Sequence, residues 1–551
     1  MNGKILNSLG LTMNTIIQHM KGKKRIPNTF YITTAIPYVN APPHIGHAME
    51  FVQTDALARY HKLLGEEVSL ITGADENSLK IVQVAVKENS TPMLVCDKNS
   101  QLFKDLANKI GFSYTAFIRS SNEKTHWPGV IAMWNMCKNS GDIYTKKYRG
   151  LYCTGCEAFY TEDELVDGLC IEHLRAPEVV EEENYFFRLS RYTNKIKKLI
   201  ETNKLKIIPE ERKREALEFV KQGLEDFSIS RSDERANGWG IQVPGDNSQR
   251  MYVWFDALGV YLTGVGFGTD KKSFTKWWPA NIHVIGKGVI RFHAVFWPAM
   301  LMSAGLPLPN EILTHGYVTI DGQKMSKSLG NVVDPMILIN KYGKDAVRYY
   351  LLRGLPTFDD GNFSERELLE VLNKELVGNI GNFVYRTLTF IRKNFGGQIS
   401  NTQLTDQDKK VLNSIYELVS GINEDLSAAR LSSAATKISE IAANGNRYFQ
   451  SMEPWKTIKI NRSDAERVMC VCANISKSLG ITFSPYMPDA AEQLFDSMNI
   501  HSPTFNDAKT LRHSFSINEP TLLFKKVEEP ENKIPKHTKH GKEPRSRAVN
   551  P

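Results

Sequence analysis

Hydrophobic and polar positions follow two different patterns along the chain, and each pattern predicts its own kind of element. From residue 29 to about residue 140, short β-branched and aromatic runs alternate with longer segments in which apolar residues recur at helical spacing. Residues 29–36 and 67–72 predict strands, and residues 45–64 predict the helix between them. Strands that alternate with helices of this length predict an α/β fold with a doubly wound parallel sheet.

This alternation stops near residue 145 and resumes near residue 246. The residues between are turn-rich and charged, whereas residues 281–318 again give the order strand, helix, strand. We therefore expect one Rossmann-like sheet in two halves, residues 28–140 and 246–360. A connective insertion at residues 141–245 splits them.

Strand patterns disappear after about residue 360. Four segments then have apolar residues at helical spacing between short polar breaks, at residues 364–396, 405–425, 428–451 and 462–480. They predict an all-α helical bundle over residues 361–526. Residues 527–551 are rich in Lys, Pro and His and almost free of apolar residues, which predicts a basic disordered tail.

Composition and charge narrow the class of protein. The chain has 551 residues, 41% hydrophobic and 24% charged, which excludes a largely disordered or fibrous protein. The formal charge of +8 is concentrated at the ends: residues 1–49 hold five basic and no acidic residues, and residues 525–551 hold eight basic and four acidic ones. Because the remainder is nearly neutral, the basic balance does not by itself indicate nucleic-acid binding. The sequence has no apolar run long enough to span a membrane.

The N-terminal 27 residues lack the apolar core and small-residue site of a secretory signal. They contain no acidic residue and are mildly amphipathic, so an organellar transit peptide and a plain N-terminal extension both remain open. With a single Arg in this segment, we favour the extension. We accordingly expect a cytoplasmic protein, with the mitochondrial matrix as the alternative.

A histidine motif, Pro-Pro-His44-Ile-Gly46-His47, stands between the first predicted strand and helix. The first N–H groups of a helix are unpaired and lie at its positive dipole end, which favours phosphate binding. Gly46 would let a ligand approach the backbone, and both imidazoles would donate to phosphate oxygens from one helix face. Taken alone, the motif is equally compatible with two surface histidines near a turn.

A second loop, residues 321–331, follows the last predicted strand and carries two lysines and two serines. Lysines on such a loop can stabilise the charge that builds on a triphosphate, although a solvated lysine–serine loop is the alternative for this segment alone. Since both loops follow strands of one parallel sheet, we expect them at the same edge. The predicted ATP-binding residues are His44, Gly46, His47, Lys324, Ser326 and Lys327.

A cysteine cluster predicts a metal site inside the insertion. Cys153 and Cys156 are two residues apart, and Cys170 and His173 repeat this spacing thirteen residues later. Three thiolates and one imidazole form a closed tetrahedral set suited to structural zinc, one ion per chain. The other four of the seven cysteines have no matched partners, and we expect them to be thiols of the hydrophobic core in a reducing compartment.

The two loop motifs, His-Ile-Gly-His and Lys-Met-Ser-Lys-Ser, resemble in type and order the signatures of class I aminoacyl-tRNA synthetases. Residues 35–40, 252–257, 292–298 and 324–331 are similar to segments of the methionyl-tRNA synthetase family, and the resemblance covers about residues 29–526. It implies an enzyme that ligates L-methionine to methionine tRNA through a methionyl-adenylate, releasing AMP and pyrophosphate. It further implies Mg²⁺ with the ATP, a monomer, and catalytic roles for His44, His47, Lys324 and Lys327.

The resemblance also assigns binding residues. It implies a methionine slot, with Asp75 as the partner of the α-ammonium group, that is lined by Ile36, Tyr38, Trp254, Ala257, Leu258, Tyr261, Val289 and His293. A thioether packs well against aromatic rings, although each aromatic residue taken alone is more typical of core packing, and only the joint match favours the slot. In the helical domain the resemblance implies anticodon binding by Asn382, Arg386 and Trp455, since Trp can stack on an unpaired base and Arg can bond its edge.

The chain departs from the family pattern at two places. Asn77 and Ser78 stand where the family often has His-Gly, and Gly288 stands where it has an Asp near the ATP ribose. Two other functions remain open: a small-molecule nucleotidyltransferase with a similar histidine loop, and a tRNA-binding paralogue without catalysis. The long α-domain argues against the first, and the intact His44, His47 and Lys327 argue against the second.

Overall fold

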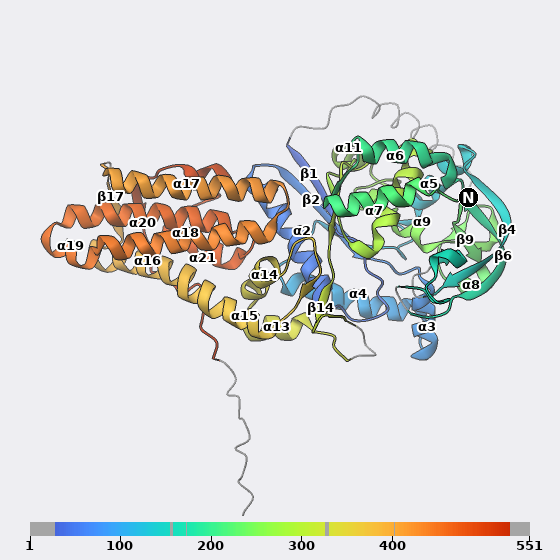
Figure 1. Ribbon diagram of the computed structural model, residues 1–551, viewed down its shortest axis with the longest axis horizontal. Coiled ribbons are helices and arrows are strands. Elements are labelled where there is room, and N and C mark those ends of the chain that lie inside the picture. The colour runs from blue at the N-terminus through green and yellow to red at the C-terminus, as the bar shows by residue number, and fades with distance from the viewer. Residues whose placement is uncertain (1–27, 155–157, 172–173, 326–329, 402, 529–551) are drawn as a thin grey trace, which may run out of the picture.

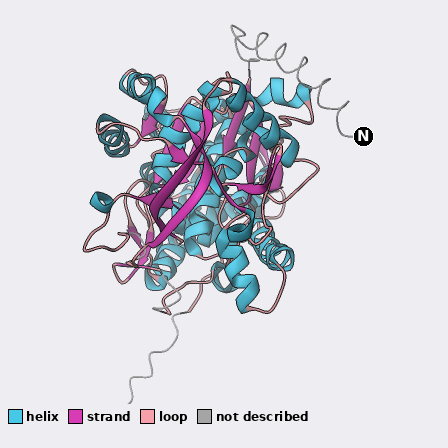
Figure 2. Cartoon of the chain, turned by 90° about the vertical axis from the view of Figure 1, so that its right-hand side faces the viewer, coloured by secondary structure: helices cyan, strands magenta, loops and turns pink. Residues whose placement is uncertain are grey.

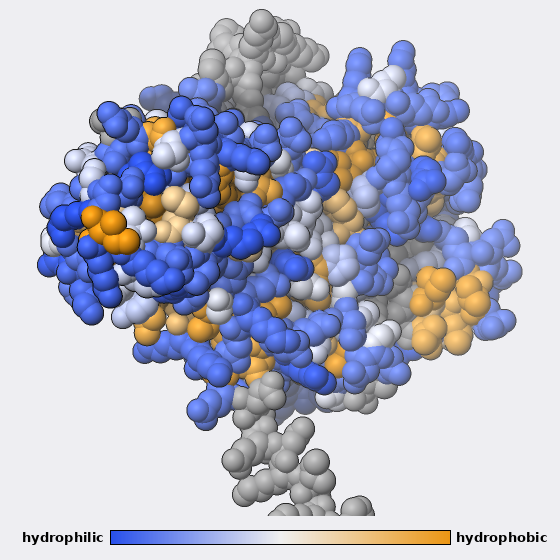
Figure 3. All heavy atoms as spheres, turned by 60° about the vertical axis from the view of Figure 1, so that its left-hand side comes forward, coloured by the Kyte–Doolittle hydropathy of each residue, from blue (hydrophilic) through white to orange (hydrophobic). Residues whose placement is uncertain are grey.

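The computed structural model describes residues 28–154, 158–171, 174–325, 330–401 and 403–528. An α/β body and an elongated helical bundle lie side by side along the long axis of the molecule (Figure 1). The end of the bundle that comes forward in Figure 3 is mostly hydrophilic, with scattered apolar patches. Within the described ranges, none of the helices combines the length and the apolar character that crossing a membrane requires.

The main sheet has the strand order β3-β2-β1-β12-β13-β7, and every neighbouring pair is parallel. Its strands are β1 (Thr29–Thr33), β2 (Glu67–Ala74), β3 (Ala116–Arg119), β7 (Lys206–Ile208), β12 (Ile282–Gly286) and β13 (Glu311–His315). β1 and β12 are direct neighbours although about 250 residues separate them. The two predicted halves therefore form one sheet, as the sequence indicated.

Both faces of this sheet are covered by helices. Since alternate residues of a strand point to opposite faces, neighbouring residues of β1 lie in different hydrophobic cores. Phe30 and Ile32 lie in one hydrophobic core, together with residues of α2 and α4. Tyr31 lies in a second core with residues of α5 and α12. The prediction of a doubly wound α/β sheet is confirmed.

Helices of the body connect these strands (Figure 1). They include α2 (Ile45–Leu63), α3 (Leu79–Lys87), α4 (Pro92–Lys109), α5 (Trp127–Asn139), α6 (Thr193–Glu201), α7 (Glu210–Lys221), α8 (Asp233–Ala236), α9 (Val253–Ala257), α10 (Val260–Thr263), α11 (Lys271–Trp277) and α12 (Trp297–Ser303). A π-helical segment, η4 (Phe292–Phe296), stands directly before α12. The single helix predicted between the two strands of residues 281–318 is therefore divided.

The insertion folds into antiparallel sheets at the end of the body. β4 (Ile143–Cys153) and β6 (Glu178–Phe187) form its longest ladder, flanked by β5 (Ala158–Tyr160) and β8 (Phe227–Ser228). A second small sheet contains β9 (Ser230–Ser232), β10 (Gln242–Val243) and β11 (Asp246–Met251). Figure 2 views the body from this side, with long strands crossing in front of helices.

One part of the predicted insertion belongs to the main sheet. β7, within residues 141–245, pairs in parallel with β13, and Ile207 opposes Ile312 across the ladder. Both isoleucines are buried, so β7 extends the hydrophobic sheet by one edge strand. Its three residues stand among charged ones, which is why the local pattern did not indicate a strand.

The C-terminal domain is a helical bundle, as predicted. Its helices include α15 (Glu365–Glu370), α16 (Asn382–Phe395), α17 (Asp406–Ser427), α18 (Leu431–Met452), α19 (Pro454–Ile460), α20 (Arg462–Phe483) and α21 (Pro488–Met498). α20 is buried along nearly its whole length and lies at the centre of the bundle. The π-helix η6 (Val371–Gly381) joins α15 to α16, so the first predicted helix is not uniformly α-helical.

A buried arginine ties the bundle to the body. Arg348, on α14 (Lys344–Arg353), is fully buried, and its guanidinium donates to Asp55 Oδ2 of α2 at 2.7 Å. It also donates to the carbonyls of Pro485 and Tyr486, both at 2.9 Å, in the segment between α20 and α21. A buried guanidinium needs several acceptors, and here they come from both domains.

Candidate functional site

The two predicted nucleotide loops lie at the carboxyl edge of the main sheet. β1, β12 and β13 are neighbours, and the histidine loop follows the first of them. After β13, the chain forms the hairpin of β14 (Val318–Ile320) and β15 (Gln323–Lys324), with a left-handed turn at Asp321 and Gly322. α13 (Pro335–Tyr342) follows this segment.

Residues on both sides of segment 326–329 contact the start of α2. The Ile45 N–H donates to the carbonyl of Val333 at 3.0 Å. On the other side, the methyl carbon of Met325 lies 3.6 Å from the position a Cβ would take on Gly46. Motifs about 280 residues apart in the sequence thus meet at one edge. Ser326 and Lys327 lie outside the described residues, as does the side chain of Lys324.

The two motif histidines stack on each other at the start of α2. Their ring centroids are 3.9 Å apart. The Nδ1 atom of His44 accepts from the Gly46 N–H, and the Nδ1 atom of His47 accepts from the His44 N–H, both at 3.1 Å. Because each Nδ1 is an acceptor, the proton of each neutral ring is on Nε2. Both rings therefore present an Nε2–H donor.

The backbone at the start of α2 differs from the expectation. The N–H groups of Ile45, Gly46 and His47 already donate to Val333 O, His44 Nδ1 and His44 O. The unpaired amides that the sequence argument assigned to phosphate are thus used within the chain. Gly46 has a different role as well, since a Cβ there would lie 3.0 Å from the His44 ring. The glycine makes room for that ring.

Burial keeps both motif histidines neutral. It lowers the pKa of His44 to about 4. It also lowers the pKa of His47 well below 6.5, and the neighbouring His44 and His315 add to this effect. Near neutral pH the two rings therefore act as uncharged hydrogen-bond donors.

A third histidine at this edge, His315, was not predicted. It ends β13, and its Nε2 lies 2.8 Å from Glu50 Oε2 on α2, while its Nδ1 lies 2.8 Å from the Gly316 carbonyl oxygen. Two acceptors for two ring nitrogens require a doubly protonated ring. Burial opposes that charge, but the hydrogen bond and charge of Glu50 outweigh it and raise the pKa of His315. His315 and Glu50 are 265 positions apart, so the sequence pattern gave no indication of this pair.

Aromatic residues of the predicted methionine slot are in contact. Trp254, on α9, lies edge-on to Tyr38 and to His293, each with a centroid separation of 6.4 Å. The Nε2 of His293 bonds the Tyr261 hydroxyl at 2.8 Å, and its Nδ1–H donates to the Val289 carbonyl at 2.9 Å. Burial lowers the pKa of His293 to about 4, so this ring is neutral.

The remaining slot residues take different positions. Asp75 directly follows β2 and is 2% exposed, and its backbone pairs with that of Tyr38. Ile36 lies above Gly73, where a Cβ would come within 3.1 Å of it. Ala257 is buried on α9, and Leu258 is part of the core beneath the slot. One contact was missed: the Phe292 ring stacks on Trp254 with centroids 3.6 Å apart.

The structure explains why a glycine stands at position 288. A Cβ at this position would lie 2.1 Å from the hydroxyl oxygen of Tyr317, so the phenol fills the space beside the glycine. Lys287 lies over the Tyr317 ring at 4.9 Å and pairs with Asp360 at 2.8 Å. The family's carboxylate could not be accommodated here unless Tyr317 moved.

The predicted metal ligands are described only in part. Cys153, at the end of β4, and Cys170 are both buried, at 4% and 0% exposure. Neither forms a disulfide. Cys156 and His173 lie outside the described residues. The other cysteines, Cys96, Cys137, Cys470 and Cys472, are buried in the core as predicted.

Two of the three predicted anticodon residues, Arg386 and Trp455, pack on one ring. Asn382 and Arg386 are on α16, and Trp455 is on α19. The Arg386 guanidinium lies 4.6 Å from the centroid of Phe449, and Trp455 packs against the same ring at 5.8 Å. Phe449, on α18, was not predicted, because it reads as a core residue of that helix. Asn382 is exposed at the edge of this cluster.

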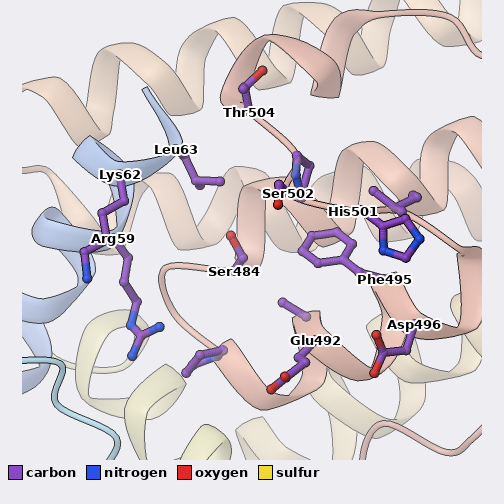
Figure 4. A pocket seen from close by; sticks show the side chains of 14 residues that line it. Arg59, Lys62, Leu63, Ser484, Glu492, Phe495, Asp496, His501, Ser502 and Thr504 are labelled. Atoms are coloured by element: carbon purple, nitrogen blue, oxygen red, sulfur yellow. The ribbon is translucent and has the colours of Figure 1, made fainter. Parts of the chain in front are cut away.

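A cavity of about 660 Å³ lies away from this site (Figure 4). It opens between the C-terminal end of α2, with Arg59 and Lys62, and α21, with Glu492. His501, on the loop after α21, also lines it. Its lining, within the described residues, contains none of the predicted site residues. His44 is at the opposite end of α2.

Comparisons with known proteins agree with this arrangement. The model of class I tRNA synthetases (M) matches residues 30–176 and 163–388, and the model of the anticodon binding domain of methionyl tRNA ligase matches residues 400–542. A methionine–tRNA ligase of Rhizobium meliloti is 43% identical over 478 residues, which cover 86% of this chain and 92% of the relative. That of Brucella suis is 41% identical over 476 residues, 86% of this chain and 92% of the relative.

A solved structure extends the likeness to three dimensions. Mycobacterium tuberculosis methionyl-tRNA synthetase in complex with methionyl-adenylate has a TM-score of 0.86 and 36% identity, covering 90% of this chain and 99% of that one. Family models, relatives matched over most of their length, and fold agree. The chain belongs to the methionyl-tRNA synthetase family of class I aminoacyl-tRNA synthetases.

Proposed function

We propose that this chain activates L-methionine with ATP and transfers it to methionine tRNA. In the first step the methionine carboxylate attacks the α-phosphorus of ATP, and pyrophosphate leaves with its Mg²⁺. In the second step the terminal ribose hydroxyl of the tRNA attacks the carbonyl of the adenylate, and AMP leaves. The observation that carries this proposal is the contact of Met325 and Val333 with the start of α2, on either side of the lysine motif.

The proposed catalysis consists of positioning and charge stabilisation. His44 and His47 donate through Nε2–H to phosphate oxygens, a role that fits their neutral rings and occupied Nδ1 atoms. Lys327, with support from Lys324 and the hydroxyl of Ser326, neutralises the charge that develops on the leaving pyrophosphate. Hydrogen-bond donors that are already in position before the reaction stabilise the developing charge most strongly in a site with few water molecules. The chain forms no covalent intermediate with the substrate.

The methionine side chain is proposed to enter between Tyr38, Trp254 and His293. The ring contacts among these residues support a slot of fixed width, in which a thioether packs against ring edges. Asp75 binds the α-ammonium group. Its burial beside Tyr38 supports a charge-assisted contact shielded from water.

The insertion is proposed to hold one structural zinc ion through Cys153, Cys156, Cys170 and His173. The burial of Cys153 and Cys170 fits this donor set, because a structural zinc site is closed and its metal stabilises the thiolates that bind it. The ion would cross-link the end of β4 to the loop around Cys170. It takes no part in the chemistry of methionine.

The tRNA is proposed to contact the tip of the bundle with its anticodon. Trp455 stacks on a base, while Asn382 and Arg386 bond base edges. The packing of Arg386 and Trp455 on Phe449 supports this role, because it holds two long side chains in place before RNA binds. We further propose that the chain is a cytoplasmic monomer. Light scattering tests the oligomeric state, and mass spectrometry of the native N-terminus tests the compartment.

Methionine-dependent exchange of pyrophosphate into ATP tests the activity directly. We expect exchange with methionine and not with leucine, followed by charging of methionine tRNA. Exchange without any tRNA charging would favour the small-molecule nucleotidyltransferase. Absence of exchange, with tRNA still bound, would favour the paralogue without catalysis.

A further inference from the structure

Four buried polar side chains form a continuous chain behind the methionine slot. The Thr263 hydroxyl lies 2.8 Å from His126 Nδ1, and His126 Nε2 lies 2.6 Å from Asp256 Oδ1. The other oxygen of that carboxylate, Oδ2, accepts from Asn77 Nδ2 at 2.5 Å. All four residues are at most 6% exposed. None of them has a role in the reaction described above.

The chain of bonds ends at a residue where this sequence departs from its family. The Nδ2 of Asn77 donates one hydrogen to Asp256 and the other to the Ser120 carbonyl at 3.1 Å. An amide nitrogen carries two hydrogens, and both are used here. The position thus requires a donor of two hydrogen bonds, which a carboxylate of the same shape cannot supply. A buried carboxylate such as Asp256 also needs the donors it has.

The bond between Asn77 and Asp256 joins two segments that carry residues of the proposed slot. Asn77 follows two residues after Asp75, the proposed ammonium partner at the end of β2. Asp256 is on α9 between Trp254 and Ala257, which line the side-chain end. The bond between Asn77 and Asp256 therefore fixes the distance between the group that would hold the ammonium and the ring that would hold the thioether.

The loop that carries Asn77 is itself firmly held. The Glu76 carboxylate accepts from Ser100 at 2.5 Å and from Arg119 at 2.7 Å, and its carbonyl accepts from Trp239 of the insertion at 2.7 Å. Loss of the Asn77 amide would leave these bonds in place. The expected response is a displacement of α9 relative to the loop, with the loop itself retained.

From this geometry we infer that Asn77 is a positioning residue for methionine. Acting through Asp256, it sets the width of the slot between Asp75 and Trp254, and thereby the length of side chain that the enzyme accepts. This inference rests on the methionine slot proposed above. It adds a determinant of amino-acid specificity that touches neither methionine nor ATP.

The experiment uses the full chain and methionine-dependent pyrophosphate exchange with Asn77→Asp, which keeps the shape and removes both donors. We expect the KM for methionine to rise by about ten- to hundredfold and the KM for ATP to stay near that of the native chain, because displacement of a positioning contact acts locally. Discrimination against ethionine, one methylene longer, should fall by about tenfold. Asn77→Ala tests the same loss without an added charge.

Ser78→Ala is the matched control on the same loop, because the buried Ser78 hydroxyl has no hydrogen-bond partner among the described residues. It should leave both KM values unchanged. Equal rises of both KM values in Asn77→Asp and Asn77→Ala, with a lower melting temperature, would reduce Asn77 to a folding residue and overturn the inference. Unchanged KM values and unchanged discrimination against ethionine in both Asn77 variants would also overturn the inference. Trp254→Ala distinguishes a failure of this inference from a failure of the proposed slot. If the KM for methionine is unchanged in Trp254→Ala as well as in the Asn77 variants, the proposed slot itself is wrong.

Discussion

The Nε2 atom of His315 lies 2.8 Å from Oε2 of Glu50, a contact that joins the helix bearing both motif histidines to the strand that leads into the lysine loop. Glu50 raises the pKa of His315, whereas burial lowers the pKa of both motif histidines. We propose that the neutral rings donate to phosphate, while the contact of His315 with Glu50 holds α2 against β13.

Replacement of Glu50 by Gln should lower the pKa of His315 below 6.5, because burial then acts without the opposing carboxylate. The native pair contributes stability that is fully present below pH 6.5 and is lost as the pH rises through the raised pKa. We expect the variant to lose about 1–3 kcal/mol of unfolding free energy at pH 6, the cost of an unmatched buried partner. NMR titration of His315 and urea denaturation measure both effects. A His315 pKa that stays above 6.5 would contradict this account.

Lys327→Ala tests the assigned role of the lysine loop. Removal of one donor to the developing charge should slow adenylate formation by about 10²–10³-fold, with methionine binding nearly unchanged. Pyrophosphate exchange and equilibrium methionine binding report the two quantities. Lys341→Ala is the control, since this lysine pairs with Glu365 on the surface. Exchange at the native rate in Lys327→Ala would remove the loop from the mechanism.

Trp455→Ala should reduce tRNA charging by about ten- to hundredfold, because base stacking contributes about 1–3 kcal/mol. Adenylate formation takes place in the other domain and should be unaffected. Trp455→Phe keeps a ring against Phe449 and should retain most of the charging activity. Equal damage to charging and to pyrophosphate exchange would show instead that Trp455 is needed for folding.

Cys153→Ser tests the zinc proposal without relying on activity. Elemental analysis should give about one zinc per native chain and none in the variant, since a site of four ligands loses most of its affinity with one thiolate. The variant's insertion should also become sensitive to proteolysis. Cys137→Ser, which alters a buried core thiol, is the control and should keep its metal. A native chain that purifies without zinc would refute the assignment.

Acidification should destabilise the fold between pH 6.5 and 4. Histidines of the unfolded chain take up protons near pH 6.5, whereas burial delays uptake by His44 and His293 to about pH 4. The stability present above pH 6.5 is thus lost through this window, at up to about 1.4 kcal/mol per pH unit for each ring. Asp345, whose pKa burial raises to about 6, opposes the effect below pH 6. Urea denaturation at pH 7 and pH 5 should give the lower unfolding free energy at pH 5; the reverse order would contradict the assignment.

The sequence by itself determined the fold class, because the periods of its apolar positions depend only on local geometry. It predicted β1, α2 and the long bundle helices α16, α17, α18 and α20, but not the shorter α19 and α21. It also placed the two loops that we propose for phosphate binding after strands of one sheet. It did not predict β7, whose Ile207 becomes a sheet residue only when it meets Ile312 of β13. Three residues carry too little periodicity to be recognised before that contact exists.

Only the tertiary structure decided how the site residues are used. Burial made His44 and His47 neutral, and the proximity of Glu50 made His315 charged, although all three are the same residue type. The amides at the start of α2 found partners within the chain, so the Nε2–H groups of the rings are the donors that we propose for phosphate. Asn77 and Asp256 are 179 positions apart and became partners through the packing of α9 against the end of β2. Charge state, donor direction and partnership depend on what surrounds a side chain, and residue type and spacing do not specify those surroundings.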